Sequence, residues 1–94
     1  MSDISITPMT KKDIETLKVF VKQALGDELG EPWTEETSKK HCLEAFNKDY
    51  CFSVKKNNQV IGGIFAYPEV FEKGTEVFID IFVVSRKERG KGIG

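Results

Sequence analysis

The sequence predicts a small α+β domain in which a mostly antiparallel sheet is flanked by helices. Helical periodicity dominates residues 11–47, whereas short apolar segments with strand-like composition fill residues 50–84. Tight-turn residues separate the last three strands, and such short connections make neighbouring strands antiparallel. Because a typical domain holds about 100–150 residues, we expect this chain of 94 residues to form one domain, residues 1–94.

The first strand and the first helix have clear boundary signals. Residues 4–7 alternate between apolar and polar side chains, which indicates a short strand. Thr10 is suited to cap the following helix, with Asp13 as its capping-box partner. Gly26 stands where a C-terminal glycine cap is common. These signals predict a helix at about residues 11–25.

A second helix follows an acidic loop at residues 26–33. Thr34 can cap this helix, and two glutamates stand in its first turn, where negative charge is favourable. A thin apolar face extends to about Asn47. The order of elements is therefore strand, helix, helix before the remaining strands begin.

A hairpin is predicted directly after the helices. Residues 50–54 and 60–67 have strand composition, and the Asn-Asn pair at 57–58 suits a tight two-residue turn between them. Paired glycines at 62–63 lie inside the second strand. Such a pair indicates a bulge or a close backbone approach.

The last predicted strand, residues 75–84 (TEVFIDIFVV), follows a second turn at 72–74 and is the most apolar segment. Simple alternation gives it one face of Glu76, Phe78, Asp80, Phe82 and Val84, and another of Thr75, Val77, Ile79, Ile81 and Val83. Because both faces are largely apolar, the pattern predicts a central strand that is covered on both sides.

Composition and charge narrow the class of protein. No apolar run reaches the roughly 18 residues of a membrane span, and the N-terminal residues lack a signal-peptide core. Fourteen basic and fifteen acidic residues give a net charge of −1, which provides no general attraction to nucleic acid or to membrane lipid. Two cysteines are too few for a disulfide scaffold, which favours a cytoplasmic protein.

The last ten residues, SRKERGKGIG, concentrate positive charge directly after the apolar strand. Glycines allow successive backbone N–H groups to converge on an anion, and arginine and lysine add charge. A Walker loop needs a Lys-Ser/Thr pair that is missing, and a Rossmann fingerprint needs the spacing G-x-G-x-x-G. The segment therefore predicts an anion-binding loop of another kind.

Residues 84–94, VSRKERGKGIG, resemble the acetyl-CoA-binding signature of the GNAT acetyltransferases, Gln/Arg-x-x-Gly-x-Gly/Ala. The order strand, two helices, three antiparallel strands and glycine loop is also similar to that family, so the resemblance covers the whole chain. It implies a GNAT-like fold. It also implies an N-acetyltransferase that moves an acetyl group from acetyl-CoA to a small-molecule or protein amine.

The resemblance implies cofactor-binding roles for two adjoining segments. In the family, the glycine loop holds the pyrophosphate of coenzyme A, and the end of the preceding strand pairs with the pantetheine arm. The matching positions here are Phe82, Val83 and Val84 on the strand, and Arg89, Gly90, Lys91, Gly92, Ile93 and Gly94 in the loop.

Asp80 matches a position where many GNAT enzymes carry a carboxylate as general base. An amine attacks a thioester only in its neutral form, so a base must take the ammonium proton directly or through water. Glu76, on the same predicted face, is the alternative base. The competing interpretations are that Asp80 is a structural acid and that Glu76 is a surface carboxylate.

The remaining reactive side chains give weaker signals. Trp33 either lines the acceptor pocket, which the first two helices shape in the family, or packs as a hydrophobic staple before Thr34. His41 and Cys42 are adjacent on a helix and point about 100° apart, so they cannot act as a pair. With Cys51 as the second cysteine, the spacing predicts no metal site.

The sequence departs from the family pattern at its C-terminal end. The family continues past the glycine loop with a helix and strands that complete the cofactor groove, whereas this sequence stops at Gly94. We therefore interpret residues 1–94 as the N-terminal part of a GNAT domain, inactive or weakly active alone. Strand 75–84 would then be an uncovered apolar edge, which favours a homodimer or higher oligomer.

Three functions remain open from the sequence. The first is an N-acetyltransferase, and the second is a non-catalytic binding or assembly module that keeps half of the GNAT fold. The third is contact of the basic tail with nucleic acid. Residues 1–84 carry ten basic and fourteen acidic residues, and this net charge of −4 disfavours the third function.

Overall fold

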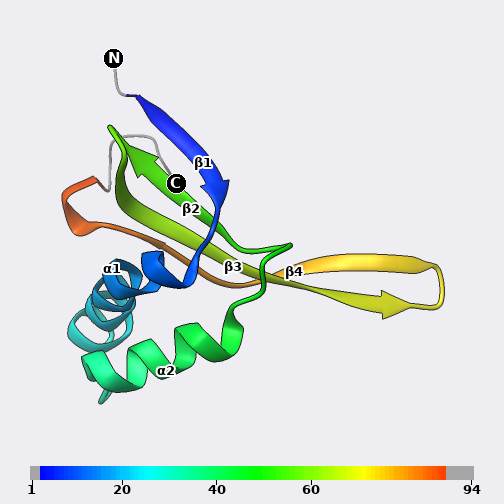
Figure 1. The fold of residues 1–94 in the computed structure, drawn as a ribbon. Helices are drawn as coiled ribbons and strands as arrows, with labels where there is room; N and C mark the ends of the chain where they lie inside the picture. The colour runs from blue at the N-terminus through cyan, green and yellow to red at the C-terminus, as the bar shows by residue number, and fades with distance from the viewer. Residues whose placement is uncertain (1–2, 89–94) are drawn as a thin grey trace.

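The computed structural model describes residues 3–88 and has the α+β architecture that the sequence predicts. Four antiparallel strands form one sheet in the order β1-β2-β3-β4, and both helices pack on the same side of it (Figure 1). The elements are β1 (Ile4–Pro8), α1 (Lys11–Val21), the π-helical segment η1 (Lys22–Glu28), α2 (Glu35–Ala45), β2 (Phe52–Lys56), β3 (Gln59–Phe71), β4 (Gly74–Val84) and the 3₁₀ turn η2 (Arg86–Glu88).

The predicted capping box at the start of α1 is confirmed. The Asp13 amide donates to Thr10 Oγ1 at 3.3 Å, and the Thr10 amide donates to Asp13 Oδ2 at 3.1 Å. The same carboxylate accepts a 2.7 Å hydrogen bond from Ser53 Oγ on β2, and Ser53 is fully buried. The capping residue therefore also joins the start of α1 to the sheet.

The predicted end of the first helix at Gly26 is wrong. The helical backbone continues as the π-helical segment η1, and the first left-handed residue after it is Gly30, with φ 73°. An added Cβ at Gly26 would lie 3.1 Å from the carbonyl oxygen of Trp33. Gly26 therefore provides room for a close backbone approach, and the acidic loop begins later than predicted.

The second helix begins at the predicted cap but ends earlier. Thr34 Oγ1 accepts a 3.1 Å hydrogen bond from the Thr37 amide, which confirms the N-cap. Helix α2 ends at Ala45, and Phe46 is already extended, whereas the sequence indicated an end near Asn47. The chain leaves the helix here because the Asn47 side chain is bonded to the Ala66 carbonyl of β3 and to the Tyr50 amide.

The turn and the glycine pair of the first hairpin behave as predicted. Asn57 and Asn58 both have positive φ, 52° and 67°, and join β2 to β3. The β2–β3 register shifts between Val54 and Lys55, beside the glycine pair. An added Cβ at Gly62 would lie 2.6 Å from the Val83 carbonyl oxygen, and one at Gly63 would lie 2.8 Å from Leu17 Cδ2. Both glycines are therefore sites of close approach.

Strand β4 is an edge strand of the described sheet. The uncovered edge predicted for residues 75–84 is therefore confirmed, whereas the central, doubly covered strand predicted from the apolar pattern is wrong. Only Ile81 and Val83 of this strand are buried. The predicted faces are also wrong, because a bulge in the β3–β4 pairing reverses the alternation: Phe65 pairs with Ile81, but Ala66 pairs with Ile79. Phe78 consequently lies with Tyr67, at a ring-centroid distance of 5.8 Å.

The distal half of the β3–β4 hairpin, residues 67–80, projects from the body as an arm (Figure 1). Strand β2 begins at Phe52, opposite Ile64, and does not reach residues 67–80, so the arm consists of two strands only. Every residue of the arm is exposed. The core lies instead between the helices and one face of the sheet and consists of Met9, Ile14, Leu17, Val21, Cys42, Cys51, Phe65, Ile81 and Val83.

Candidate functional site

Asp80 occupies the bulge of strand β4. Its neighbours Ile79 and Ile81 pair with the consecutive residues Ala66 and Phe65, which leaves Asp80 as the extra residue of the strand. The side chain is exposed, and β4 is the last strand of the described sheet. Bulges of this kind redirect side chains beside functional sites. Asp80 is therefore accessible to a molecule that approaches the open edge of β4.

Glu76, the alternative carboxylate, lies in the arm and is separated from Asp80. It pairs directly across the hairpin with Glu69, so two like charges face each other there. Four residues along a strand correspond to about 13 Å. The structure therefore places the two candidate carboxylates at different places along β4, and only Asp80 lies at the bulge next to the body.

The predicted cofactor-contacting strand residues lie at the end of β4 that joins the body. Val83 is buried and pairs with Gly63, beneath Leu17 of α1. Phe82 is 46% exposed and lies on the sheet face opposite the helices. Val84 is the last residue of the strand and is partly buried. The predicted loop residues Arg89, Gly90, Lys91, Gly92, Ile93 and Gly94 lie outside the described residues.

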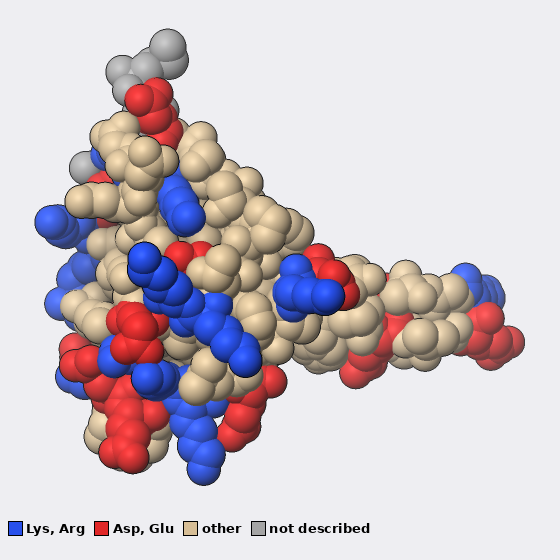
Figure 2. Space-filling view, viewed as in Figure 1, with Lys and Arg blue, Asp and Glu red and all other residues tan. Residues whose placement is uncertain are grey.

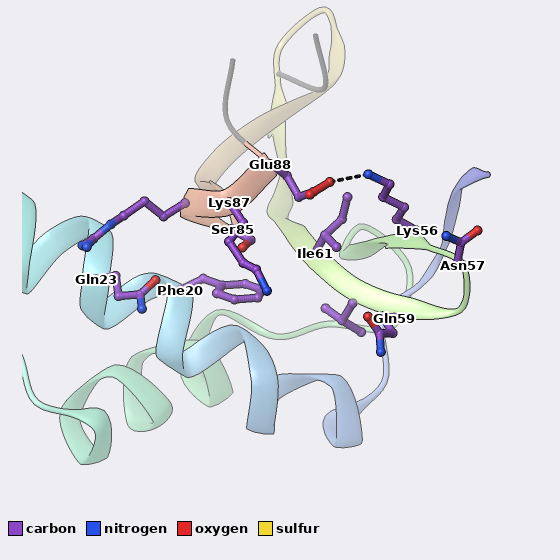
Figure 3. Close-up of a pocket in the computed structure, with 11 residues that line it drawn as sticks. Phe20, Gln23, Lys56, Asn57, Gln59, Ile61, Ser85, Lys87 and Glu88 are labelled. Carbon is purple, nitrogen blue, oxygen red and sulfur yellow. Dashed lines mark hydrogen bonds and ion pairs between the residues drawn. The ribbon is translucent and has the colours of Figure 1, made fainter. Parts of the chain in front are cut away.

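A cavity of about 600 Å³ opens beside the residues that lead into this loop (Figure 3). Its walls come from the end of α1 and the start of η1, from the β2–β3 turn, and from residues 85–88. The lining residues are Phe20, Gln23, Lys56, Asn57, Gln59, Val60, Ile61, Ser85, Arg86, Lys87 and Glu88. Three of these side chains, Lys56, Arg86 and Lys87, are cationic and one, Glu88, is anionic. The excess of positive charge favours an anionic group in the cavity.

Two ion pairs and two backbone hydrogen bonds hold the segment before the loop. Lys56 Nζ lies 2.9 Å from Glu88 Oε1, and Arg86 Nε lies 3.7 Å from Glu28 Oε2. The Ser85 amide donates to the Ile61 carbonyl at 2.6 Å, and the Glu88 amide donates to the Ser85 carbonyl at 2.9 Å. The sequence did not indicate the role of Lys56, because 32 residues separate it from its partner.

Trp33 makes contacts other than a hydrophobic staple. Its Nε1 donates to Glu31 Oε1 at 2.9 Å, and its ring lies 5.3 Å from that of His41. An open depression of about 440 Å³ is lined by Glu31, Pro32, Trp33 and Thr37. A carboxylate beside an aromatic ring can contact a cation, and the assignment of this depression to an acceptor stays a prediction.

Charge is unevenly distributed over the surface. Figure 2 shows that charged side chains gather over the helical body, whereas much of the arm is uncharged, with acidic and basic groups at its tip. Within residues 3–88, no cluster of three or more His, Cys, Asp or Glu residues is arranged to hold a metal ion. Over the same residues, no helix has the length and hydropathy needed to cross a membrane.

Comparisons with known proteins identify the family to which this fold belongs. Residues 18–94 match the acetyltransferase (GNAT) family model. The chain therefore belongs to the GNAT acetyltransferase family. No protein with a curated description matches the sequence significantly.

Solved structures show the same fold. A GNAT family acetyltransferase from Staphylococcus aureus is 28% identical, with a TM-score of 0.66 over 99% of this chain and 70% of that one. A "possible acetyltransferase" from Clostridium difficile is 19% identical, with a TM-score of 0.78 over 96% of this chain and 62% of that one. A predicted acetyltransferase with acetyl-CoA from Clostridium acetobutylicum is 21% identical, with a TM-score of 0.66 over 96% and 65%. The chain thus spans about two thirds of the length of these structures.

Proposed function

We propose that this chain is part of an N-acetyltransferase that transfers the acetyl group of acetyl-CoA to a small-molecule or protein amine. The observation that carries the proposal is the bulged, exposed Asp80 on the open edge of β4, five residues before Ser85, where the chain reaches the cationic cavity. Membership of the GNAT family supports the reaction class.

The residues at the end of β4 fit the chemistry of acetyl-CoA. The cations Arg86 and Lys87 of the cavity are suited to phosphate groups, and the open strand edge is suited to the amide groups of the pantetheine arm. We assign cofactor binding to Phe82, Val83 and Val84, and to the loop from Arg89 to Gly94. The cofactor would supply a thioester as acetyl donor.

Asp80 is the proposed general base. The acceptor nitrogen bonds to the acetyl carbon while the carbon–sulfur bond breaks, and coenzyme A leaves as its thiolate with the electron pair of that bond. The proton lost by the nitrogen passes to Asp80 directly or through water. An exposed carboxylate at an open edge can be reached by an incoming ammonium group. Glu76 is the weaker candidate for the base, because it lies in the arm and faces the like negative charge of Glu69.

The test compares Asp80→Asn with the matched variant Glu76→Gln in the acetylating protein that contains this chain. We expect Asp80→Asn to lower kcat by about 10²-fold, the lower range for loss of a general base, with acetyl-CoA affinity unchanged. Glu76→Gln should leave kcat near the wild-type value. An unchanged rate in Asp80→Asn would reject this residue as the base, and a loss only in Glu76→Gln would transfer the role.

We further propose that residues 1–94 alone bind acetyl-CoA weakly and have little activity. The supporting observation is that the chain spans 62% to 70% of the matched chains named above. Calorimetric titration of this chain with acetyl-CoA, beside a longer protein that contains it, measures the difference. Equal affinities of the two proteins would contradict this proposal.

We propose that a second copy of the chain pairs along the outer edge of β4. An isolated two-stranded ribbon is marginal in water, and an exposed apolar edge strand readily pairs with another chain. The arm exposes Val70 and Ile79 at 84% and 64%. Light scattering should therefore give a mass above 10.6 kDa at high protein concentration. A mass of 10.6 kDa throughout would refute self-association.

The exposed arm also favours a second candidate function, a non-catalytic binding or assembly module. That function predicts self-association or partner binding without acetylation, so the rate measurement above separates it from the enzyme. For either function we propose a cytoplasmic location, because both cysteines are buried and free, as in proteins of reducing compartments.

A further inference from the structure

Lys56 and Glu88 join two distant parts of the chain next to the proposed phosphate loop. Lys56 is the last residue of β2, and Glu88 is the last residue of η2, immediately before Arg89. Their charged atoms lie 2.9 Å apart, and Figure 3 shows the contact at the edge of the cavity. We propose that Lys56 is a positioning residue that fixes residues 85–88, the described segment that leads to the proposed phosphate loop, an inference that rests on the proposed cofactor role of that loop.

The geometry gives the segment 85–88 two separate attachments to the sheet. The Ser85 amide is hydrogen-bonded to the Ile61 carbonyl of β3, and Glu88 is held by Lys56 of β2. An attachment at each end fixes both the position and the direction in which the chain leaves η2. The Lys56 end is itself firmly placed, because the tight β2–β3 turn follows directly.

Burial explains why this ion pair matters more than a surface pair. The side chain of Glu88 is 10% exposed and that of Lys56 is 28% exposed. Removal of the lysine takes one ion-pair partner from a largely buried carboxylate, and weakening a buried ion pair costs more than weakening an exposed one. The pair between Arg86 and Glu28 is longer, 3.7 Å, with side chains 55% and 35% exposed, and such pairs contribute little. It provides a matched control on the same segment.

A positioning role differs from direct phosphate binding by Lys56. If Lys56 held the phosphate itself, Glu88→Gln would release the lysine and strengthen anion binding. A positioning role predicts the opposite: Lys56→Met and Glu88→Gln each weaken binding. The double variant should lose less affinity than the sum of the two single losses, because the two substitutions remove a shared contact. Lys56→Arg should retain wild-type behaviour, since the arginine can still pair with Glu88.

The experiment measures two properties of the 94-residue chain by NMR at fixed ionic strength. The first is the hydrogen-exchange protection of the Ser85 and Glu88 amides without ligand, and the second is the affinity for inorganic pyrophosphate. We expect Lys56→Met to lose Glu88 amide protection and to weaken pyrophosphate binding about fivefold. The control variant Arg86→Met should keep the Glu88 amide protected from hydrogen exchange. Urea denaturation measures the free energy of unfolding of each variant, so that a local loss of protection is distinguished from a global loss of stability.

The outcomes separate this inference from the proposed function. Unchanged Glu88 protection in Lys56→Met, or stronger pyrophosphate binding by Glu88→Gln, overturns the positioning role. If the wild-type chain does not bind pyrophosphate, the proposed cofactor role of the loop loses support. The protection of Glu88 then still decides whether Lys56 positions the segment. If Lys56→Met does not fold, Glu88→Gln and Lys56→Arg provide the same comparison.

Discussion

The side-chain amide of Asn47 donates a 2.7 Å hydrogen bond to the carbonyl of Ala66 on β3. Strand β2 begins at Phe52, opposite Ile64, so its backbone does not pair with Ala66. The Asn47 side chain contacts the backbone of β3 there instead. Asn47 Oδ1 also accepts a 2.7 Å hydrogen bond from the Tyr50 amide. Ala66 pairs with Ile79 at the bulge, so this one side chain supports β3 where the arm begins.

Asn47→Ala should destabilise the protein by about 1–3 kcal/mol, because it leaves a backbone carbonyl and an amide without their partners. Asn47→Asp should recover part of this loss, since its carboxylate still accepts from Tyr50 but cannot donate to Ala66. Urea denaturation of the two variants measures both values. A loss below about 0.5 kcal/mol for Asn47→Ala, the usual range for neutral surface changes, would contradict the role.

The paired glycines should differ in their tolerance of a methyl group. An added Cβ at Gly62 would meet the backbone oxygen of Val83 at 2.6 Å, whereas one at Gly63 would meet the ends of Leu17 and Met9 at 2.8 and 3.2 Å. Side-chain ends can move but a paired backbone cannot. We expect Gly62→Ala to cost about 2–3 kcal/mol and Gly63→Ala about 1 kcal/mol. Thermal unfolding measures the order, and the reverse order would refute the argument.

Stability should fall at low pH through Asp13. Burial would raise the pKa of this carboxyl, but hydrogen bonds from Ser53 and Thr10, with the charge of Lys55, hold the pKa below its ordinary 3.8. Because the pKa of Asp13 is lower in the folded protein than in the unfolded chain, the ionised carboxylate stabilises the fold at pH values above the unfolded pKa of 3.8. This contribution is lost as the pH falls below 3.8. Asp13→Asn should be about 1–2 kcal/mol less stable at pH 7, and the difference should shrink towards pH 2. A constant difference across that range would contradict the prediction.

Stability should also fall at high pH through Cys42. Burial raises the pKa of this thiol from 9.0 to about 11. Because the folded pKa lies above the unfolded one, the contribution is complete below pH 9.0 and is lost as pH rises to about 11. Cys42→Ala should therefore show a flatter stability profile over this interval, although it is less stable at pH 7. Identical slopes for the two proteins would exclude the thiol as the cause.

Salt should strengthen the proposed pairing of two copies along β4. The arm carries four carboxylates, Glu69, Glu72, Glu76 and Asp80, against Lys73. Pairing of two such edges brings like charges together, and salt screens their repulsion over distances beyond about 8 Å at physiological ionic strength. The dimer fraction seen by sedimentation should rise between low and high salt. Glu76→Gln should associate more strongly at low salt, and dissociation by added salt would contradict the model of an apolar seam.

Local signals predicted much of the fold because they act over a few residues. The Thr10 and Thr34 caps, the Asn-Asn turn and the close approach at the glycine pair are each set by neighbouring backbone geometry. The continuation of the first helix through Gly26 was not predicted. The requirement there comes from Trp33, which packs against the glycine from a later part of the loop.

The predicted faces of β4 were wrong for a similar reason. Alternation along one strand assumes regular pairing, but β4 carries one residue more than β3 at this point, and that extra residue, Asp80, sits apart from its neighbours. The carboxylate was therefore identified from the sequence as a candidate, while its place at an exposed bulge came from the structure. The loop candidates from Arg89 to Gly94 stay predictions from the motif.

By itself, the sequence determined the order of the elements, the caps and turns that bound them, and the resemblance to the GNAT family, because these depend on residues close together in the chain. Only the tertiary structure decided where the bulge in β4 lies and which lysine meets Glu88. Those features depend on contacts between residues far apart in sequence, such as Lys56 and Glu88, which no local pattern encodes.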